Sequence, residues 1–327
     1  MFTFFLVTFF LGLCEYSSAS RQFLKLEKFQ QERPVIGIVT VPGQKESFTD
    51  LGKTQYIFEM NEVFMSKQDI DSVFIPYNIN DKDLYEVLQK INGVFFTGGD
   101  VDLYDEKTGE LHIYTITSQK IFHYALNQTD NGDYYPIIGI CQGIELLHII
   151  VANNTQALGW SKYENKRANT QINHHLFNSS RLLQSLTSEV LHTIQQRDIL
   201  YHLHHRGIPV KDYERFEKLA DFFHILSTNI FEDQEIVSTA EAKNYPIYVF
   251  QYHPEVVYEP TPDINSDKSR HSVTFAHQLT SFFKAELLKN NHRFESEEDI
   301  DQIRVRNGFK GKTSYVQDFA NTFGFDY

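Results

Sequence analysis

A short apolar run that ends directly in a cysteine between two glycines is the feature that most constrains the fold of this chain. Residues 137–140 read IIGI, residues 139–143 read GICQG, and residues 144–151 are apolar almost throughout. This order predicts a buried strand, a sharp turn and a helix packed against a sheet. The G-x-C-x-G sequence is the thiol form of a nucleophile elbow, in which small neighbours permit a strained turn. We therefore expect Cys141 to be a nucleophile whose pKa is lowered by the helix behind it. A cysteine that only packs is the alternative.

Other short apolar runs indicate an α/β fold around this elbow. Further buried strands are predicted at residues 35–41, 73–76, 93–96 and 247–252. Helical spacing is found at residues 54–68, 81–89, 117–127 and 272–289. The alternation is typical of a mainly parallel central sheet flanked by helices. Residues 156–240 read as short strands and polar turns, which predicts a small antiparallel extension, and the polar segment after residue 290 has no clear pattern.

Residues 252–255, which read YHPE, supply the predicted base for this thiol. They follow the run 247–252, and the carboxyl ends of parallel strands face one crevice, so we expect His253 beside Cys141. Pro254 is expected to hold the segment extended, which places His253 and Glu255 on the same side. Glu255 then fixes the imidazole tautomer as the third member of a triad.

Two glycines at the end of another predicted strand supply the expected oxyanion site. Gly98 and Gly99 follow the run 93–96, and glycines let backbone N–H groups approach a substrate oxygen closely. Together with the backbone N–H of Gln142 they are predicted to form an oxyanion hole. A simple tight turn is the alternative interpretation of the two glycines.

These three segments, in this order, resemble the class I glutamine amidotransferase superfamily, and within it the γ-glutamyl hydrolases. The resemblance extends from about residue 33 to the C-terminus, with further matching segments at residues 33–38, 91–96, 290–298 and 325–327. It implies a class I glutamine amidotransferase-like fold and a cysteine hydrolase that cuts the γ-glutamyl bonds of folylpoly-γ-glutamates through a thioester acyl-enzyme. It also implies Cys141 as nucleophile, His253 as base and Glu255 as the supporting carboxylate, with no metal and no organic cofactor.

Three positions depart from this resemblance. Thr97 and Tyr252 stand where Pro and Trp are common, and Gln142 stands where Leu is frequent. The first two bear on substrate fit, whereas only the backbone of Gln142 is needed for the oxyanion role. Two other functions stay open: an amidotransferase subunit that releases ammonia from glutamine for a partner enzyme, and a catalytically inactive secreted binding protein on the same fold.

A dense histidine cluster lies outside the three motifs. His202, His204 and His205 stand beside Arg206, but their spacing matches no usual zinc pattern. Because the resembling family carries a His-basic pair in this stretch, the resemblance implies that His205 and Arg206 contact the α-carboxylate of the substrate. Exposed loop residues without a function are the alternative.

The first twenty residues predict a signal peptide. Residues 2–13 are apolar and uncharged and small residues follow at 17–20, although no basic residue precedes the run. We therefore expect residues 1–20 to be removed and residues 21–327 to form a single domain that is secreted or lysosomal/vacuolar. Cys14 lies in this segment, which leaves Cys141 without a disulfide partner. A buried helix or an uncleaved anchor is the alternative.

Composition and short motifs define the expected partners. The net charge of −13 argues against nucleic acid, because phosphate binding needs a Lys/Arg surface. The expected partner is a small-molecule γ-glutamyl substrate, no membrane is expected after signal removal, and a homodimer stays open beside a monomer. Sequons at Asn127, Asn153 and Asn178 predict N-linked glycans.

Overall fold

An eight-stranded sheet forms the centre of the chain. The computed structural model describes residues 31, 33–43, 53–315 and 318–327, so the predicted signal peptide lies outside the described residues. The strands run in the order β4 (Asp71–Ile75), β1 (Val35–Val39), β5 (Gly93–Phe96), β6 (Ile137–Ile140), β12 (Ile247–Phe250), β11 (Gln234–Ala242), β10 (Phe223–Phe231) and β8 (Gln171–Ile172). The first five are mutually parallel and the last three antiparallel. The predicted mainly parallel sheet is confirmed.

Both faces of this sheet are buried, because successive side chains of each strand enter opposite apolar layers. In β1, Val35 and Val39 belong to one hydrophobic cluster and Ile36 and Ile38 to the other. The strands therefore read as continuous apolar runs and not as an alternating pattern.

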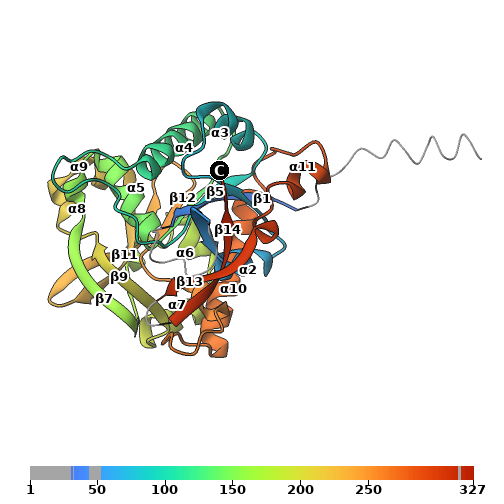
Figure 1. Cartoon of the computed structure of the whole chain (residues 1–327). Coiled ribbons are helices and arrows are strands. Elements are labelled where there is room, and N and C mark those ends of the chain that lie inside the picture. The colour runs from blue at the N-terminus through green and yellow to red at the C-terminus, as the bar shows by residue number, and fades with distance from the viewer. Residues whose placement is uncertain (1–30, 32, 44–52, 316–317) are drawn as a thin grey trace, which may run out of the picture.

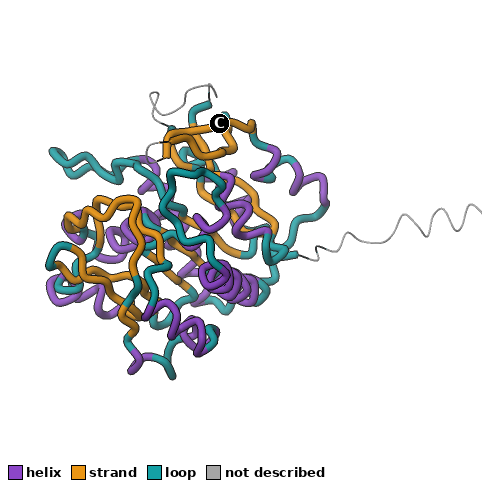
Figure 2. Tube along the Cα trace, turned by 90° about the horizontal axis from the view of Figure 1, so that it is seen from below, coloured by secondary structure: helices purple, strands orange, loops and turns teal. Residues whose placement is uncertain are grey.

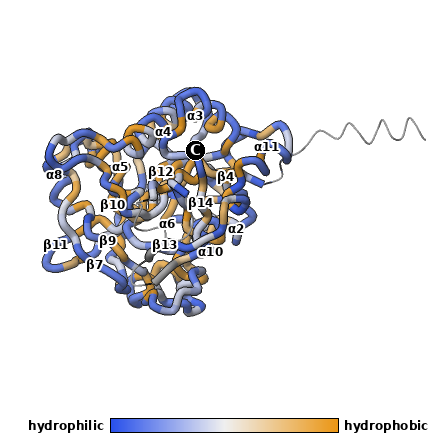
Figure 3. The backbone as a smooth tube through the Cα atoms, in the orientation of Figure 1, coloured by the Kyte–Doolittle hydropathy of each residue, from blue (hydrophilic) through white to orange (hydrophobic). Residues whose placement is uncertain are grey.

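Helices cover each face. On one side lie α3 (Asp81–Leu88), α4 (Ile113–Asp130) and α5 (Gln142–Ala152), and on the other α2 (Glu59–Ser66), α6 (Arg181–Ser185), α7 (Ser188–Gln196) and α10 (Arg270–Leu287). Figure 1 shows the first group in the upper part of the view and the second group below the sheet. Figure 2 shows the helices in purple around the orange strands. In Figure 3 the outer helix α3 is mostly blue, whereas orange segments gather on the inner elements. No described helix has the length and apolar character needed to cross a bilayer.

Two smaller antiparallel sheets complete the described chain. One has the order β13 (Phe309–Tyr315), β14 (Asp318–Phe325), β3 (Gln55–Phe58) and β2 (Val41–Pro42), and the other pairs β7 (Gly159–Ala168) with β9 (Leu200–Gly207). The β7–β9 pair, together with the edge strands β11, β10 and β8, is the antiparallel extension that the sequence predicts. The helix expected over residues 54–68 is wrong in its first part, because β3 is held as a strand by β14.

Residues 156–240 contain more helix than expected. Besides α6 and α7, they include α8 (Asp212–Arg215) and α9 (Glu217–Phe222). The side chain of Thr187 caps α7 by accepting from the backbone N–H of Val190, and Val190, Leu191 and Ile194 pack under the sheet. Short turns of 3-10 helix occur at η1 (Thr155–Ala157), η2 (His174–Leu176), η3 (Pro254–Tyr258) and η4 (Val305–Asn307), and α11 (Glu297–Asp301) follows the long C-terminal helix.

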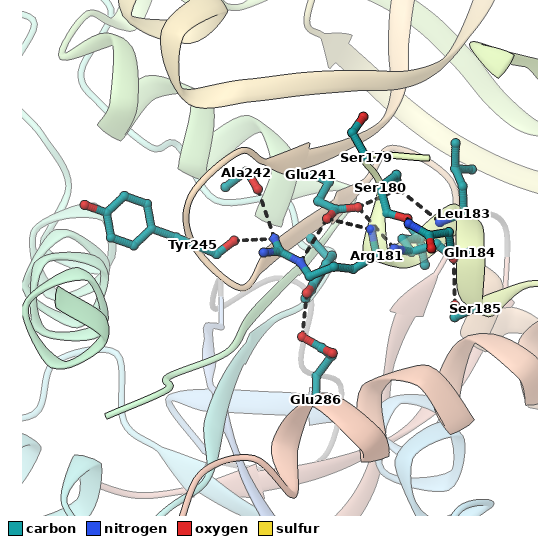
Figure 4. A network of polar contacts seen from close by, with 12 residues as sticks. Ser179, Ser180, Arg181, Leu183, Gln184, Ser185, Glu241, Ala242, Tyr245 and Glu286 are labelled. Atoms are coloured by element: carbon teal, nitrogen blue, oxygen red, sulfur yellow. Dashed lines mark hydrogen bonds and ion pairs between the residues drawn. The ribbon is translucent and has the colours of Figure 1, made fainter. Parts of the chain in front are cut away.

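A buried carboxylate joins α6 to the sheet (Figure 4). Glu241 of β11 accepts hydrogen bonds from Ser180 Oγ at 2.6 Å and from the backbone N–H groups of Arg181 at 3.1 Å and Leu182 at 3.2 Å. The Nε of Arg181 pairs with the same carboxylate at 3.0 Å, and its Nη2 donates to Tyr245 O at 2.7 Å. The first turn of a five-residue helix is thus held by one anion, which satisfies N–H groups that the helix itself cannot pair.

The three sequon asparagines lie on the surface. Asn127 is in α4, Asn153 ends α5 in a left-handed conformation with φ 50°, and Asn178 follows η2. All three side chains are exposed.

Candidate active site

The turn between β6 and α5 has the strained backbone of a nucleophile elbow. Cys141 has φ 53° and ψ −107°, which is uncommon for a residue with a side chain. Its backbone N–H donates to Phe250 O at 2.7 Å, which anchors the turn to β12. A Cβ on Gly143 would lie 2.4 Å from the backbone oxygen of Phe96, so only glycine lets α5 pack this closely on β5.

His253 and Glu255 form a buried pair at the end of β12. Nδ1 of His253 lies 2.7 Å from Oε1 of Glu255, and both side chains are almost fully buried. The two residues lie on the same side as expected, but the predicted extended conformation is wrong. Pro254 begins the 3-10 turn η3, because a proline with fixed φ suits the first position of a helical turn.

The ends of β5, β6 and β12 meet at one point, as the order of these adjacent strands dictates. A Cβ on Gly98 would lie 2.7 Å from Cε1 of His253 and 3.4 Å from Cβ of Cys141. Nε2 of His253 is buried and has no nitrogen or oxygen partner among the described residues. The Cys141 thiol forms a hydrogen bond with Leu203 O at 3.5 Å. The structure therefore brings the predicted thiol, imidazole and glycine turn together.

Burial raises the pKa of Cys141. The charge and hydrogen bond of His253 act to lower this pKa, but they do not outweigh the effect of burial. The pKa lowering expected from the helix is therefore not the net result. Burial also acts to lower the pKa of His253, but the Cys141 and Glu255 charges outweigh it and raise that pKa well above its usual value. The thiol and the imidazole thus titrate as one coupled pair.

Two backbone N–H groups next to the thiol are free to bind an anion. Those of Gly99 and Gln142 have no hydrogen-bond partner among the described residues. The side chain of Gln142 has a further role that sequence reasoning missed. Its Nε2 donates to Val101 O at 2.8 Å and its Oε1 accepts from Val101 N at 3.2 Å. This amide ties the start of α5 to the loop that carries Gly99.

The thiol and the imidazole line a pocket of about 530 Å³. Its wall comes from three parts of the chain: β3 with the start of α2, the loop after β5, and the β7–β9 pair. Residues 98–106 contribute several carboxylates, including Asp100, Asp102 and Glu106. The cavity is large enough for a small ligand with several polar groups.

His205 and Arg206 lie in the pocket wall, and their contact with a substrate carboxylate stays a prediction. Each is paired with a carboxylate in this structure, His205 with Glu164 and Arg206 with Glu106.

The neighbouring histidines are buried and neutral. Nδ1 of His202 lies 3.2 Å from Nε2 of His204, and Nδ1 of His204 lies 2.8 Å from Ser161 O. Burial lowers the pKa of His204 to about 4 and that of His202 well below its usual value. Among the described residues no group of three or more His, Cys, Asp or Glu side chains is arranged to hold a metal ion.

Several residues of the site carry no sequence signal. Tyr201 and Leu203 of β9 hold the site through backbone oxygens, the former by accepting from His253 N at 2.8 Å. Trp160 of β7 stands in the pocket wall. Glu145 of α5 also lines the pocket, and its place just inside the elbow helix does predict either a role in orienting the site or a role as a helix cap. Burial raises the pKa of Glu145 to about 7. The positions of the β7 and β9 residues depend on how these two strands pair, and the burial of Glu145 depends on how α5 packs. A single sequence specifies neither.

Comparison with known proteins identifies the family. A model of the Peptidase C26 family matches residues 34–255. The chain belongs to this family. Gamma-glutamyl hydrolase 1 of Arabidopsis thaliana is 30% identical over 274 residues, which cover 83% of this chain and 76% of that protein. Gamma-glutamyl hydrolase of Homo sapiens is 28% identical over 320 residues, 97% of each chain.

Membership of Peptidase C26 establishes a cysteine-type hydrolase, as the elbow predicts. Among solved structures, the glutaminase domain of Trypanosoma brucei CTPS with bound acivicin has a TM-score of 0.51 and 14% identity, covering 79% of this chain and 95% of that chain. This likeness concerns the fold alone, and it agrees with the predicted glutamine amidotransferase-like architecture.

Proposed function

We propose that this chain hydrolyses γ-glutamyl peptide bonds, with folylpoly-γ-glutamates as the substrate, using Cys141 as nucleophile and His253 as base. The observation that carries the proposal is the meeting of Cys141 and the His253 ring at Gly98, where a Cβ would lie 3.4 Å from Cβ of Cys141 and 2.7 Å from Cε1 of His253. The names of the relatives, gamma-glutamyl hydrolases of a plant and of a mammal, support this bond type.

The acylation step begins when the Cys141 thiol passes its proton to Nε2 of His253 and the sulfur attacks the γ-carbonyl carbon. The carbonyl π electrons move to oxygen, and the oxyanion accepts from the free N–H groups of Gly99 and Gln142. As the tetrahedral intermediate collapses, the C–N bond breaks and Nε2 of His253 gives its proton to the leaving α-amine. A thioester between Cys141 and the γ-glutamyl group remains.

Deacylation reverses the proton path. A water attacks the thioester carbon and gives a proton to Nε2 of His253, and the C–S bond breaks as the γ-carboxylic acid leaves and loses its remaining proton to solvent. The proton then returns to the Cys141 sulfur. Glu255 stabilises the imidazolium in both steps through its 2.7 Å contact with Nδ1. No metal or organic cofactor enters either step.

We assign His205 and Arg206 to the substrate α-carboxylate, for which their place in the pocket wall is the support. The glycans at Asn127, Asn153 and Asn178 and the removal of residues 1–20 belong to the same proposal, which takes residues 21–327 as one secreted or lysosomal domain. The exposure of the three asparagines supports the proposed glycans.

The test compares wild type with Cys141→Ala on pteroyl-tri-γ-glutamate, with release of free glutamate as the readout. Wild type should cleave and the variant should not, and equal cleavage by both contradicts the nucleophile assignment. Glutamine in place of the folate separates the alternative of a glutaminase, since ammonia release faster than γ-glutamyl cleavage favours that activity. Glycosidase treatment of protein secreted from eukaryotic cells tests the sequons, since unchanged mass contradicts them.

A further inference from the structure

The only tryptophan of the chain stands in the wall of the active-site pocket. Trp160 lies near the start of β7, where it pairs with Arg206 of β9. It lines the same cavity as Cys141 and His253, yet its side chain is 58% exposed. A single exposed apolar side chain is ordinary on a protein surface. Here the exposed indole faces the cavity in which the reaction takes place.

Two side chains of β9 contact the Trp160 ring. The Arg206 guanidinium lies over the indole ring, 5.7 Å from the ring centroid, and the His205 ring is nearly parallel to it, at 10° and 6.1 Å between centroids. Arg206 is held in turn by Glu106, and His205 by Glu164. Two polar side chains of β9 therefore contact the indole, each of them paired with a carboxylate, while more than half of the indole surface stays open.

We propose that Trp160 is a stacking platform for a planar aromatic group on the γ-glutamyl substrate, so that the pocket favours aryl-bearing γ-glutamyl compounds over aliphatic ones. This inference deepens the proposed function and rests on it. A large flat ring that is already oriented loses little freedom when a second ring stacks on it. The neighbouring Arg206 and His205 suit an aromatic group whose chain carries a carboxylate, because a γ-glutamyl unit places an anion a few bonds from the ring.

The substrate pair that tests this differs only in the ring. N-benzoyl-γ-glutamylglutamate carries a phenyl group where N-acetyl-γ-glutamylglutamate carries a methyl group. Aromatic contacts of the usual strength change binding by about 2- to 12-fold, so the ratio of kcat/KM for the benzoyl over the acetyl compound should exceed one by this factor in wild type. In Trp160→Ala the ratio should fall to about one, and in Trp160→Phe it should be largely restored. Phe177→Ala, which removes an exposed aromatic side chain outside the pocket, is the matched control and should leave the ratio unchanged. An unchanged ratio in Trp160→Ala overturns the proposal.

A second measurement does not depend on turnover. Because Trp160 is the sole tryptophan, the intrinsic tryptophan fluorescence of Cys141→Ala reports on this position alone. Titration with the benzoyl compound should change its intensity in a saturable way, and the acetyl compound should change it less. Equal responses to both compounds, or no response, contradict the platform. If wild type cleaves neither compound, the proposed function fails, while this titration still decides whether Trp160 binds an aryl group.

Discussion

The Gln142→Leu substitution removes the amide that joins α5 to the loop after β5. This amide makes two hydrogen bonds with the backbone of Val101, at 2.8 Å and 3.2 Å, and its Oε1 lies 2.8 Å from the place that a Cβ on Gly99 would take. Leucine has a similar length and makes neither bond. The backbone N–H at this position stays in place, so a loss of activity reports the position of the Gly99 loop and not the loss of a donor.

The size of the effect follows from those two bonds. Each contributes about 1 kcal/mol net, so the loop loses about 2 kcal/mol of preference for its present position, a factor of about 30. Complete loss of an oxyanion donor lowers kcat by about 100- to 1,000-fold. We therefore expect kcat to fall by about 10- to 30-fold with KM nearly unchanged, because the donor acts on charge that develops in the transition state.

The assay is steady-state hydrolysis of a γ-glutamyl dipeptide by both proteins, with Gln184→Leu as the matched control. The Gln184 amide also makes two backbone hydrogen bonds, to Asn178 O at 3.2 Å and Ser180 O at 3.1 Å, but it lies outside the pocket. This control should retain full kcat. The reasoning is refuted if Gln142→Leu keeps the wild-type kcat, or if the control loses as much.

Three further predictions concern buried carboxyl groups. Glu255→Gln should lower kcat by about 10⁴-fold, because the amide favours the wrong imidazole tautomer; a loss below tenfold in kinetic assays contradicts this. The pKa of Glu145 is raised from 4.5 to about 7, so between these pH values the folded state binds more protons than the unfolded chain and stability falls as pH rises. In urea unfolding above pH 7, the free energy of unfolding of Glu145→Gln should therefore exceed that of wild type by up to about 3 kcal/mol. Below pH 4.5 the two proteins should be equally stable, and a difference that does not change with pH argues against the raised pKa. Glu241→Ala should lower the free energy of unfolding by about 3–5 kcal/mol, since it leaves the Arg181 charge unpaired, and an unchanged urea midpoint speaks against that role.

Local patterns in the sequence were sufficient to predict the catalytic strands. The runs that end in Gly98, Cys141 and His253 are buried on both faces, so their composition alone marks them as central strands. Their convergence follows from the parallel order β5, β6, β12. The pairing of His253 with Glu255 was also predictable, although the 3-10 turn that produces it was not.

Features that depend on distant contacts escaped prediction. β3 is a strand because β14 pairs with it, and no local signal in residues 55–58 reveals that partner. The pKa of the Cys141 thiol depends on burial by segments far along the chain, and this burial outweighs the lowering that His253 causes. The wall formed by Trp160, Leu203 and Arg206 likewise depends on the register of β7 against β9.

The pairing of β3 with β14 also has a consequence for synthesis. Tyr56 and Phe58 reach the pocket from β3, and their register partners on β14, Gly324 and Thr322, are translated long after the nucleophile and the base. A nascent chain that already holds the reactive thiol therefore lacks one side of its substrate cavity. We therefore expect hydrolytic activity only after β14 has been synthesised and has paired with β3.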